Sequence, residues 1–191
     1  MSEPNQEPLP SLEEVGRERA RLSGRRRFLS GVLLAAVAIV AVAVVLATLY
    51  LPVLQVSGDS MEPTLRSGDV LVLTKTSTPK SGDICGFYWQ NKILIKRIIG
   101  LPGDVVDIGL DGVVTVNGQP LEEPYTAQLA LGECDIDFPY QVPEGRYFVM
   151  GDHRLTSIDS RSTVVGCVET SQIVGRAALR VWPLSRFGSV H

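Results

Sequence analysis

Apolar and polar positions divide the 191-residue chain into three stretches of different character. Residues 1–27 are polar and rich in charge, residues 28–52 carry no charged side chain, and residues 53–191 alternate between short apolar runs and turn residues. A polar tail with nothing to bury is expected to be disordered. We therefore predict a disordered tail over 1–27, one transmembrane helix over 28–52 and a folded domain over 53–191.

The membrane segment is predicted from its length. Residues 32–51 are apolar at every position except Thr48, and a helix of that length spans about 30 Å, the hydrocarbon thickness of a bilayer. The alternative is a cleaved leader peptide, whose apolar core is shorter, at roughly 7–15 residues. The length favours a retained single-pass anchor.

The charges that flank this segment predict its orientation. Residues 17–27 contain six arginines and one glutamate, and no Lys or Arg then occurs before Arg66. By the positive-inside rule the N-terminus is cytoplasmic and the domain lies on the other side of the cell membrane.

Short runs rich in Val and Ile, separated by Gly, Pro and Asp, predict strands rather than helices in the outer domain. The runs are residues 69–74, 83–89, 92–99, 104–109, 113–118, 146–152 and 172–184. Helical turns are expected only near residues 62–66 and 170–173, and residues 131–145 have the pattern of an irregular excursion. The prediction is a mostly β domain of curled or barrel-like antiparallel sheets.

Composition narrows the possible functions of this domain. Its 12 basic and 16 acidic residues, a net charge of −4, give no electrostatic case for a nucleic-acid partner. The sequence has no phosphate-cradling loop and no His or Cys cluster with metal-ligand spacing, so we predict neither cofactor nor metal. The three cysteines, Cys85, Cys134 and Cys167, leave at least one unpaired within the chain, and those near predicted strands suit small buried side chains.

Ser60 is the candidate nucleophile, in the sequence SGDSMEPTL (residues 57–65). A serine hydroxyl needs a neighbouring base, and the chain has only two histidines, His153 and His191. A lysine can replace histidine if burial lowers its pKa, because a free lysine with a pKa near 10.4 is charged at pH 7.

Lys96 has the most apolar surroundings of the four lysines in the domain, within ILIKRIIG. In a strand it shares one face with Leu94 and Ile98. An ordinary surface lysine on the open side of a sheet would give the same pattern, so periodicity alone leaves both interpretations open.

The stretch GDHRLTSIDSR (residues 151–161) is dense in polar groups. Its residues Asp152, Arg154, Ser157, Asp159 and Arg161 could fix a polar site. They could equally form surface ion pairs in a solvated loop, where each pair contributes little.

Together, SGDSMEPTL, SGDVLVL, IKRIIGLPGD and GDHRLTSIDSR, in this order behind an apolar segment, resemble bacterial signal peptidase I over about residues 28–184. The resemblance implies a serine–lysine dyad with Ser60 as nucleophile and Lys96 as general base. It further implies that Ser157 orients the lysine, and that Asp159 and Arg161 hold the site together as an ion pair.

The sequence departs from the family pattern at two positions. Gly58 stands where some relatives carry a serine whose hydroxyl helps to bind the oxyanion, so the backbone N–H of Ser60 is expected to contribute instead. His153 stands where asparagine is frequent, and with Lys96 present we expect it to be a bystander. Asp152 and Arg154 are expected to be structural.

The same resemblance implies the substrate, which is the signal peptide of a translocated preprotein held near membrane lipid. Leu54, Val56 and Ile95 match positions that shape the pockets for small side chains before the cleaved bond. Two alternatives stay open: another membrane-anchored Ser/Lys processing peptidase, and a non-enzymatic membrane-anchored β-domain that binds partners.

Overall fold

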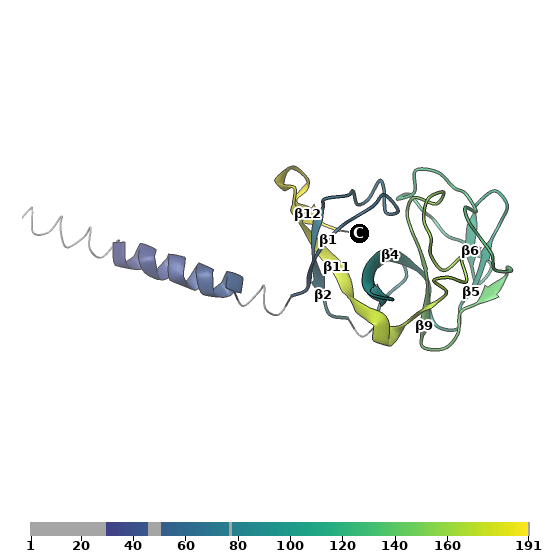
Figure 1. Cartoon of the computed structure of the whole chain (residues 1–191), viewed down its shortest axis with the longest axis horizontal. Coiled ribbons are helices and arrows are strands. Elements are labelled where there is room, and N and C mark those ends of the chain that lie inside the picture. Colours follow the sequence, from purple (N-terminus) through teal and green to yellow (C-terminus); the bar gives the residue numbers. More distant parts are fainter. Residues whose placement is uncertain (1–29, 46–50, 77, 191) are drawn as a thin grey trace, which may run out of the picture. The chain divides into compact units, whose positions relative to one another are not determined.

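The computed structural model describes residues 30–45, 51–76 and 78–190. The chain divides into two compact units, Met1–Leu49 and Tyr50–His191. The first contains a helix over residues 30–45, and all sixteen of its residues are exposed (Figure 1).

The predicted tail, residues 1–27, lies outside the described residues, and so do parts of the predicted membrane segment, residues 28–52. Among the residues that are described, no helix has both the length and the apolar character needed to cross a membrane. The membrane span therefore stays a prediction.

The regular secondary structure described in the second unit is almost entirely antiparallel β-strand, in two sheets, which confirms the mostly β prediction. The larger sheet has the order β1-β2-β11-β3-β4-β9-β10, with β12 paired to β11, and the smaller sheet has the order β7-β6-β5-β8. The strands are β1 (Val53–Gln55), β2 (Val70–Thr74), β3 (Ile84–Trp89), β4 (Lys92–Gly100), β5 (Val105–Ile108), β6 (Val114–Val116), β7 (Gln119–Pro120), β8 (Tyr140–Gln141), β9 (Arg146–Met150), β10 (Val168–Glu169), β11 (Ile173–Trp182) and β12 (Gly188–Ser189). Two short 3₁₀ helices are η1 (Thr170–Gln172) and η2 (Leu184–Arg186).

Each predicted run of Val and Ile contains a strand, and η1 forms where a helical turn was expected. A single helical turn also forms near residues 62–66, where the Leu65 N–H donates to the Met61 carbonyl at 2.8 Å, although it does not extend into a helix. Strands β1, β7, β8, β10 and β12 have only two or three residues. Such short segments are set by their pairing partners and carry no readable period of their own.

Strand β4 lies at the centre of the domain and curls between its two ends (Figure 1). It pairs with β3 on one side and β9 on the other, and every residue from Lys96 to Gly100 is buried. A Cβ atom added at Gly100 would lie 2.7 Å from the Val106 Cγ2 atom of β5. The glycine therefore lets β4 lie directly against the smaller sheet.

The apolar core has three clusters, and β4 contributes to all of them. The connection from β1 to β2, residues 56–69, carries Ser60, and we call it the Ser60 turn. Ile95 packs against the first cluster, which includes Leu65 of this turn and Leu71 of β2. Ile99 belongs to the second, which includes Phe148, and Ile98 to the third. The position of β4 is thereby fixed from several directions by close-packed side chains.

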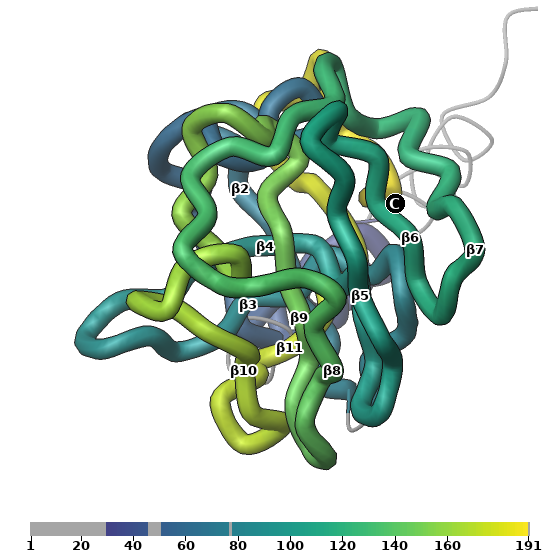
Figure 2. Tube along the Cα trace, turned by 90° about the vertical axis from the view of Figure 1, so that its right-hand side faces the viewer, coloured from purple at the N-terminus to yellow at the C-terminus, as the bar shows by residue number. Residues whose placement is uncertain are grey.

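The segment between β7 and β8, residues 121–139, forms neither helix nor strand, and we call it the strap. It overlaps the first part of the irregular excursion that the sequence predicts over 131–145. In Figure 2 it is the green tube that leaves β7, passes over the domain and returns to β8.

The three cysteines are all free in this structure. Cys85 and Cys167 are buried in the core, as the sequence analysis expected, and Cys134 on the strap is half-buried. Burial raises the pKa of the Cys85 thiol to about 12, so this thiol stays protonated and unreactive at neutral pH.

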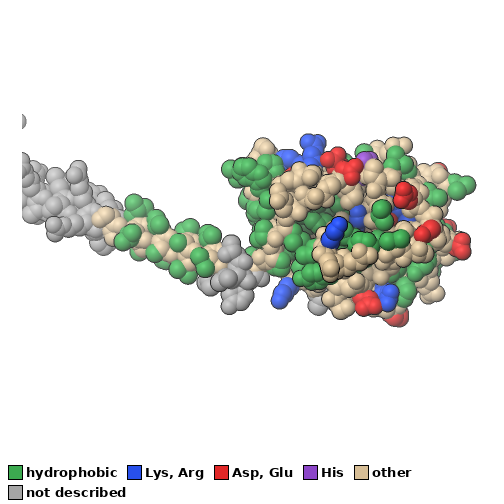
Figure 3. Space-filling view, in the orientation of Figure 1, with side chains coloured by type: hydrophobic (Ala, Val, Ile, Leu, Met, Phe, Trp, Pro, Cys, Tyr) green, Lys and Arg blue, Asp and Glu red, His purple; other side chains and the backbone are tan. Residues whose placement is uncertain are grey.

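Exposed apolar side chains gather at the end of the larger sheet where β1 and η2 lie (Figure 3). They are Val53, Trp182, Leu184 and Phe187, each about half exposed or more. An exposed apolar group of this kind is a candidate surface for contact with another apolar phase or partner.

Phe148 provides a test of the core. It is fully buried and its ring contacts those of Phe138 and Tyr140. Phe148→Ala should lower the free energy of unfolding by about 3–5 kcal/mol, measured by denaturant unfolding in mild detergent. The control Phe187→Ala, at a ring that is 59% exposed, should change it by less than about 0.5 kcal/mol. Equal effects of the two substitutions would contradict this core.

Candidate active site

The Ser60 turn connects β1 to β2 and is fixed by its own apolar residues. Met61 and Leu65, which both follow Ser60 in this connection, are buried in the first core cluster. Gly58 has a φ of +92°, a left-handed conformation in which a serine would be strained. Among the described residues, neither the N–H nor the hydroxyl of Ser60 has a hydrogen-bond partner.

Lys96 is buried in the middle of β4, at 3% exposure. The interpretation as an ordinary surface lysine is therefore wrong. Lys96 and Ser60 line the same pocket, which has a volume of about 100 Å³. The full lining is Gln55, Val56, Ser57, Gly58, Ser60, Met61, Ile93, Leu94, Ile95 and Lys96.

Burial lowers the pKa of Lys96 from 10.5 to about 8. The main cause is desolvation of the ammonium, and the carboxylate of Asp159 acts in the opposite direction. A substantial fraction of the side chain is therefore neutral at a pH near 8, and a neutral amine beside a serine can accept its proton.

Residues 151–161 form a loop whose carboxylates, arginines and Ser157 are buried, although Leu155 and Ile158 are exposed. The side chains of Asp152, Arg154, Ser157, Asp159 and Arg161 are each at most 1% exposed. The interpretation as a loop with surface ion pairs is therefore wrong, and each polar group here needs a partner inside the protein.

Asp159 is the acceptor at the centre of this loop. It accepts hydrogen bonds from the Ser157 hydroxyl at 2.7 Å, the Gly151 N–H at 2.9 Å and the Arg161 guanidinium at 2.8 and 2.9 Å. The bonds from Arg161, Gly151 and Ser157 hold its pKa below the usual value, although burial acts the other way. The predicted Asp159–Arg161 ion pair is present in the structure.

The loop lies directly on the Ser60 turn. The His153 N–H donates to the Ser60 carbonyl at 3.1 Å. A Cβ atom added at Gly151 would lie 2.4 Å from that same carbonyl oxygen and 2.3 Å from the Ser157 hydroxyl oxygen. Only glycine permits this approach, which brings Ser157 close to the Ser60 backbone.

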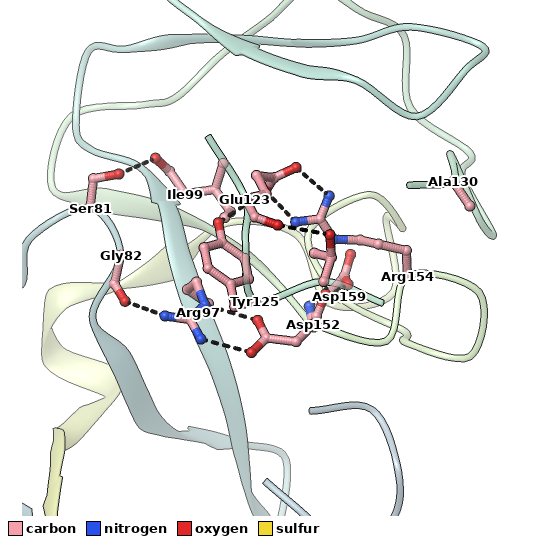
Figure 4. Close-up of polar contacts among 12 residues, drawn as sticks. Ser81, Gly82, Arg97, Ile99, Glu123, Tyr125, Ala130, Asp152, Arg154 and Asp159 are labelled. Atoms are coloured by element: carbon pink, nitrogen blue, oxygen red, sulfur yellow. Dashed lines mark hydrogen bonds and ion pairs between the residues drawn. The ribbon is translucent and has the colours of Figure 1, made fainter. Parts of the chain in front are cut away.

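Arg97, the neighbour of Lys96, forms a second buried ion pair with the loop (Figure 4). Its guanidinium donates to both carboxylate oxygens of Asp152, at 2.9 and 2.7 Å, and to the Gly82 carbonyl at 2.8 Å. Asp152 also accepts from the Thr64 hydroxyl at 2.5 Å. Asp152 therefore joins β4 to the Ser60 turn.

Sequence reasoning missed Thr64, Glu123 and Tyr125. The Glu123 carboxylate pairs with Arg154, and the Tyr125 ring lies 3.8 Å from the Arg97 guanidinium carbon. The strap sequence LEEPYT has the polar composition of a surface loop, so no signal in it distinguishes these two residues.

The His153 side chain contacts Thr156 and Asp59. Its Nδ1 atom lies 3.0 Å from the Thr156 hydroxyl and 3.6 Å from a carboxylate oxygen of Asp59. In the described part of the chain its ring makes no hydrogen bond with the Ser60 hydroxyl. This placement agrees with a bystander role.

Two of the three predicted pocket residues, Val56 and Ile95, line the pocket beside Ser60. Leu54 does not line this cavity. It packs against the first core cluster, and its Cδ1 atom would lie 3.1 Å from a Cβ atom at Gly86. Its predicted role in substrate binding stays a prediction.

The described residues contain no group of three or more His, Cys, Asp and Glu side chains suited to a metal ion. The groups available for chemistry are the hydroxyl and backbone N–H of Ser60 and the Lys96 amine of lowered pKa, and both residues line one small pocket.

The burial of Lys96 predicts a pH-dependent cost in stability. Below pH 8 the lysine is protonated in both states, and the shift from 10.5 to about 8 destabilises the fold by about 3 kcal/mol. As pH rises through this window the unfolded chain binds more protons than the folded one, so the cost is lost. Lys96→Met should therefore stabilise the protein near pH 7, by up to about 3 kcal/mol, and less near pH 10.

Denaturant unfolding at both pH values measures this difference. Lys92→Met, at the exposed first residue of the same strand, is the matched control and should change stability by less than about 0.5 kcal/mol at either pH. A Lys96→Met protein no more stable than the wild type near pH 7 would contradict the buried lysine.

The chain is similar in sequence to known proteins. Residues 29–182 match the model of a family described as signal peptidase, peptidase S26. The chain is 41% identical over 148 residues to a signal peptidase I of Bacillus caldolyticus, a match that covers 69% of this chain and 80% of that one. It is 37% identical over 152 residues to a signal peptidase I of Leptolyngbya laminosa, covering 71% and 70%. A crystal structure of a signal peptidase I from Enterococcus faecalis V583 matches with a TM-score of 0.44 and 32% identity, over 53% of this chain and 97% of that chain.

Proposed function

The chain belongs to the signal peptidase family, peptidase S26, and from this premise we propose that it is a membrane-bound serine endopeptidase that removes N-terminal signal peptides from translocated preproteins. Ser60 and Lys96 are its catalytic dyad. The observation that carries the proposal is the small pocket lined by both residues, in which the lysine is almost fully buried.

The proposed mechanism uses the lysine first as a base and then as an acid. Neutral Lys96 accepts the proton of the Ser60 hydroxyl, and the Ser60 oxygen attacks the scissile carbonyl carbon. The Ser60 N–H, which has no other partner among the described residues, donates to the oxyanion. Lys96 then passes its proton to the leaving amine and activates the water that hydrolyses the acyl-enzyme.

Ser157 is proposed to orient the lysine amine. Its hydroxyl donates to Asp159 and is fixed there, with its oxygen lone pairs left for a second partner. Asp159 is fixed in turn by Arg161. The Asp159–Arg161 ion pair thereby holds the Ser157 hydroxyl in one place.

The size and lining of the pocket support a preference for small side chains next to the cleaved bond. A volume of about 100 Å³ bounded by Val56, Met61 and Ile95 leaves room for a methyl group and excludes large side chains. We propose that alanine-like residues at the first and third positions before the cleaved bond are selected in this way.

Membrane attachment is proposed from the sequence and from the surface of the domain. The apolar segment within residues 28–52 would anchor the chain with a cytoplasmic N-terminus. The exposed group Val53, Trp182, Leu184 and Phe187 would contact lipid, because aromatic and aliphatic side chains favour the membrane interface.

The dyad predicts the results of four substitutions. Ser60→Ala and Lys96→Ala should abolish cleavage of a preprotein with an Ala-x-Ala site, and Lys96→Arg should fail as well because a guanidinium stays protonated. His153→Asn should retain most of the activity. Cleavage products are identified by mass spectrometry, and circular dichroism controls for the fold.

The same dyad sets the pH dependence of the rate. Since kcat/KM reports ionisations of the free enzyme, its acidic limb should have a midpoint near the Lys96 pKa of about 8 and should persist in His153→Asn. An inactive His153→Asn protein together with an active Lys96→Ala protein would assign the base to the histidine instead.

If the first unit serves only as a membrane anchor, the second unit should keep peptidase activity on its own. A chain that begins at residue 50 keeps every strand of the described residues and should still cleave a soluble peptide substrate. Its rate should rise when detergent or phospholipid vesicles are added, if the exposed apolar group contacts lipid. A shortened protein that is folded by circular dichroism but inactive under all of these conditions would count against this layout.

A further inference from the structure

Three arginines are buried in β4 and in the loop of residues 151–161, and the strap contacts each of them. Arg97, Arg154 and Arg161 are at most 2% exposed. A buried guanidinium is tolerated only when its charge and its N–H groups are matched by fixed partners. The strap supplies part of that set for all three, although no strap residue lines the pocket.

Glu123 holds Arg154. Its carboxylate forms a two-point pair with the Arg154 guanidinium, with one contact at 3.0 Å between Nη1 and Oε2 and a second, shorter one between Nη2 and Oε1. The side chains are 2% and 1% exposed. The Arg154 Nε–H donates to the Gly151 carbonyl at 3.1 Å, and Gly151 lies against the Ser60 backbone.

Tyr125 holds Arg97. The aromatic ring covers the guanidinium, with 3.8 Å from the Arg97 Cζ atom to the ring centre. The Tyr125 hydroxyl donates to Glu123 at 3.0 Å, so the two strap residues form one unit (Figure 4). Arg97 follows Lys96 directly in β4, and a displaced Arg97 would move the backbone of that strand.

The third contact is made by the backbone of the strap. The Arg161 Nη1 group donates to the Leu131 carbonyl at 2.6 Å. A Cβ atom added at Gly132 would lie 2.6 Å from that same Nη1 atom. The strap therefore approaches closely at this position as well.

Each of the three arginines has a carboxylate partner only when the strap is counted. Three guanidinium groups face the carboxylates of Asp152, Asp159 and Glu123. Asp152 and Asp159 come from the loop itself, and Glu123 is the one that comes from another segment. Its removal would leave Arg154 buried without a counter-charge.

We propose that Glu123 and Tyr125 are positioning residues for catalysis: through Arg154 and Arg97 they fix Gly151 and β4, and with them the distance between Ser60 and Lys96. The proposal rests on the dyad of the proposed function. Because neither residue touches the pocket, their loss should lower the rate of the chemical step and leave substrate binding nearly unchanged.

The first test is Glu123→Gln in the full-length chain in detergent, with Glu122→Gln as the matched control. Glu122 is the adjacent carboxylate and is exposed. Glu123→Gln should lower kcat for an Ala-x-Ala peptide by about 10²-fold, the scale of a 1 Å misplacement of reacting groups. KM should change by less than about twofold, and Glu122→Gln should match the wild type.

Tyr125 gives an independent variant in case Glu123→Gln does not fold. Tyr125→Leu removes the ring from Arg97 and should lower kcat with KM retained. Tyr125→Phe keeps the ring and should recover most of the lost rate. Tyr88→Phe, at an exposed tyrosine, is the control for the loss of a hydroxyl. Wild-type kcat in both Glu123→Gln and Tyr125→Leu, or a loss confined to KM, would overturn the proposal.

Hydrogen–deuterium exchange separates this inference from the proposed function. In Glu123→Gln the amides of residues 151–161 should exchange faster than in the wild type, and in Glu122→Gln they should not. If Ser60→Ala still cleaves, the dyad is wrong, whereas faster exchange would still support the coupling of strap and loop. If Ser60→Ala is inactive and exchange in Glu123→Gln is unchanged, the dyad stands and the positioning role is wrong.

Discussion

A buried carboxylate, Asp152, determines how the Ser60 turn and β4 lie relative to each other. No hydrogen bond joins Ser60 to Lys96 among the described residues. Instead Thr64, four residues after the serine, and Arg97, one residue after the lysine, both donate to Asp152, at 2.5 Å and at 2.7 and 2.9 Å. A short charge-assisted network of this kind has little freedom. The spacing of the two candidate catalytic groups therefore depends on a third group that need not take part in the chemistry.

Stability alone does not explain so many buried charges. An ion pair removed from water regains in Coulomb attraction about what it loses in solvation, and apolar residues of similar volume often stabilise a fold as well or better. Asp152, Asp159 and Glu123 each pair with an arginine at or below 2% exposure. What such pairs provide is geometry, because a planar guanidinium and a carboxylate fit each other in few orientations. A site that must hold a serine and a lysine at a fixed separation benefits from that restriction.

The parts that could be predicted from sequence are those encoded locally. The run ILIKRIIG has the composition of a strand, and β4 forms there with Lys96 inside it. Alternation could not decide whether Lys96 is exposed, since the answer depends on what covers its face of the sheet. The cover comes from the Ser60 turn and residues 151–161, which are distant in sequence. For the same reason Glu123 and Tyr125 could not be found, because the partners that give them a role, Arg154 and Arg97, are 31 and 28 positions away.

Asp159 and Arg161 have opposite effects on the pKa of Lys96. In the proposed mechanism Ser157 needs a fixed acceptor, which the Asp159 carboxylate provides, but a negative charge near Lys96 favours the ammonium form and raises the pKa of the lysine. Arg161 lies on the same carboxylate at 2.8 Å, and its positive charge lowers that pKa. Burial has the largest effect on Lys96, while Asp159 and Arg161 act on it in opposite directions, and the pKa falls to about 8. The Asp159 carboxylate thus holds the Ser157 hydroxyl, while Arg161 counteracts the rise that this carboxylate causes in the pKa of the lysine.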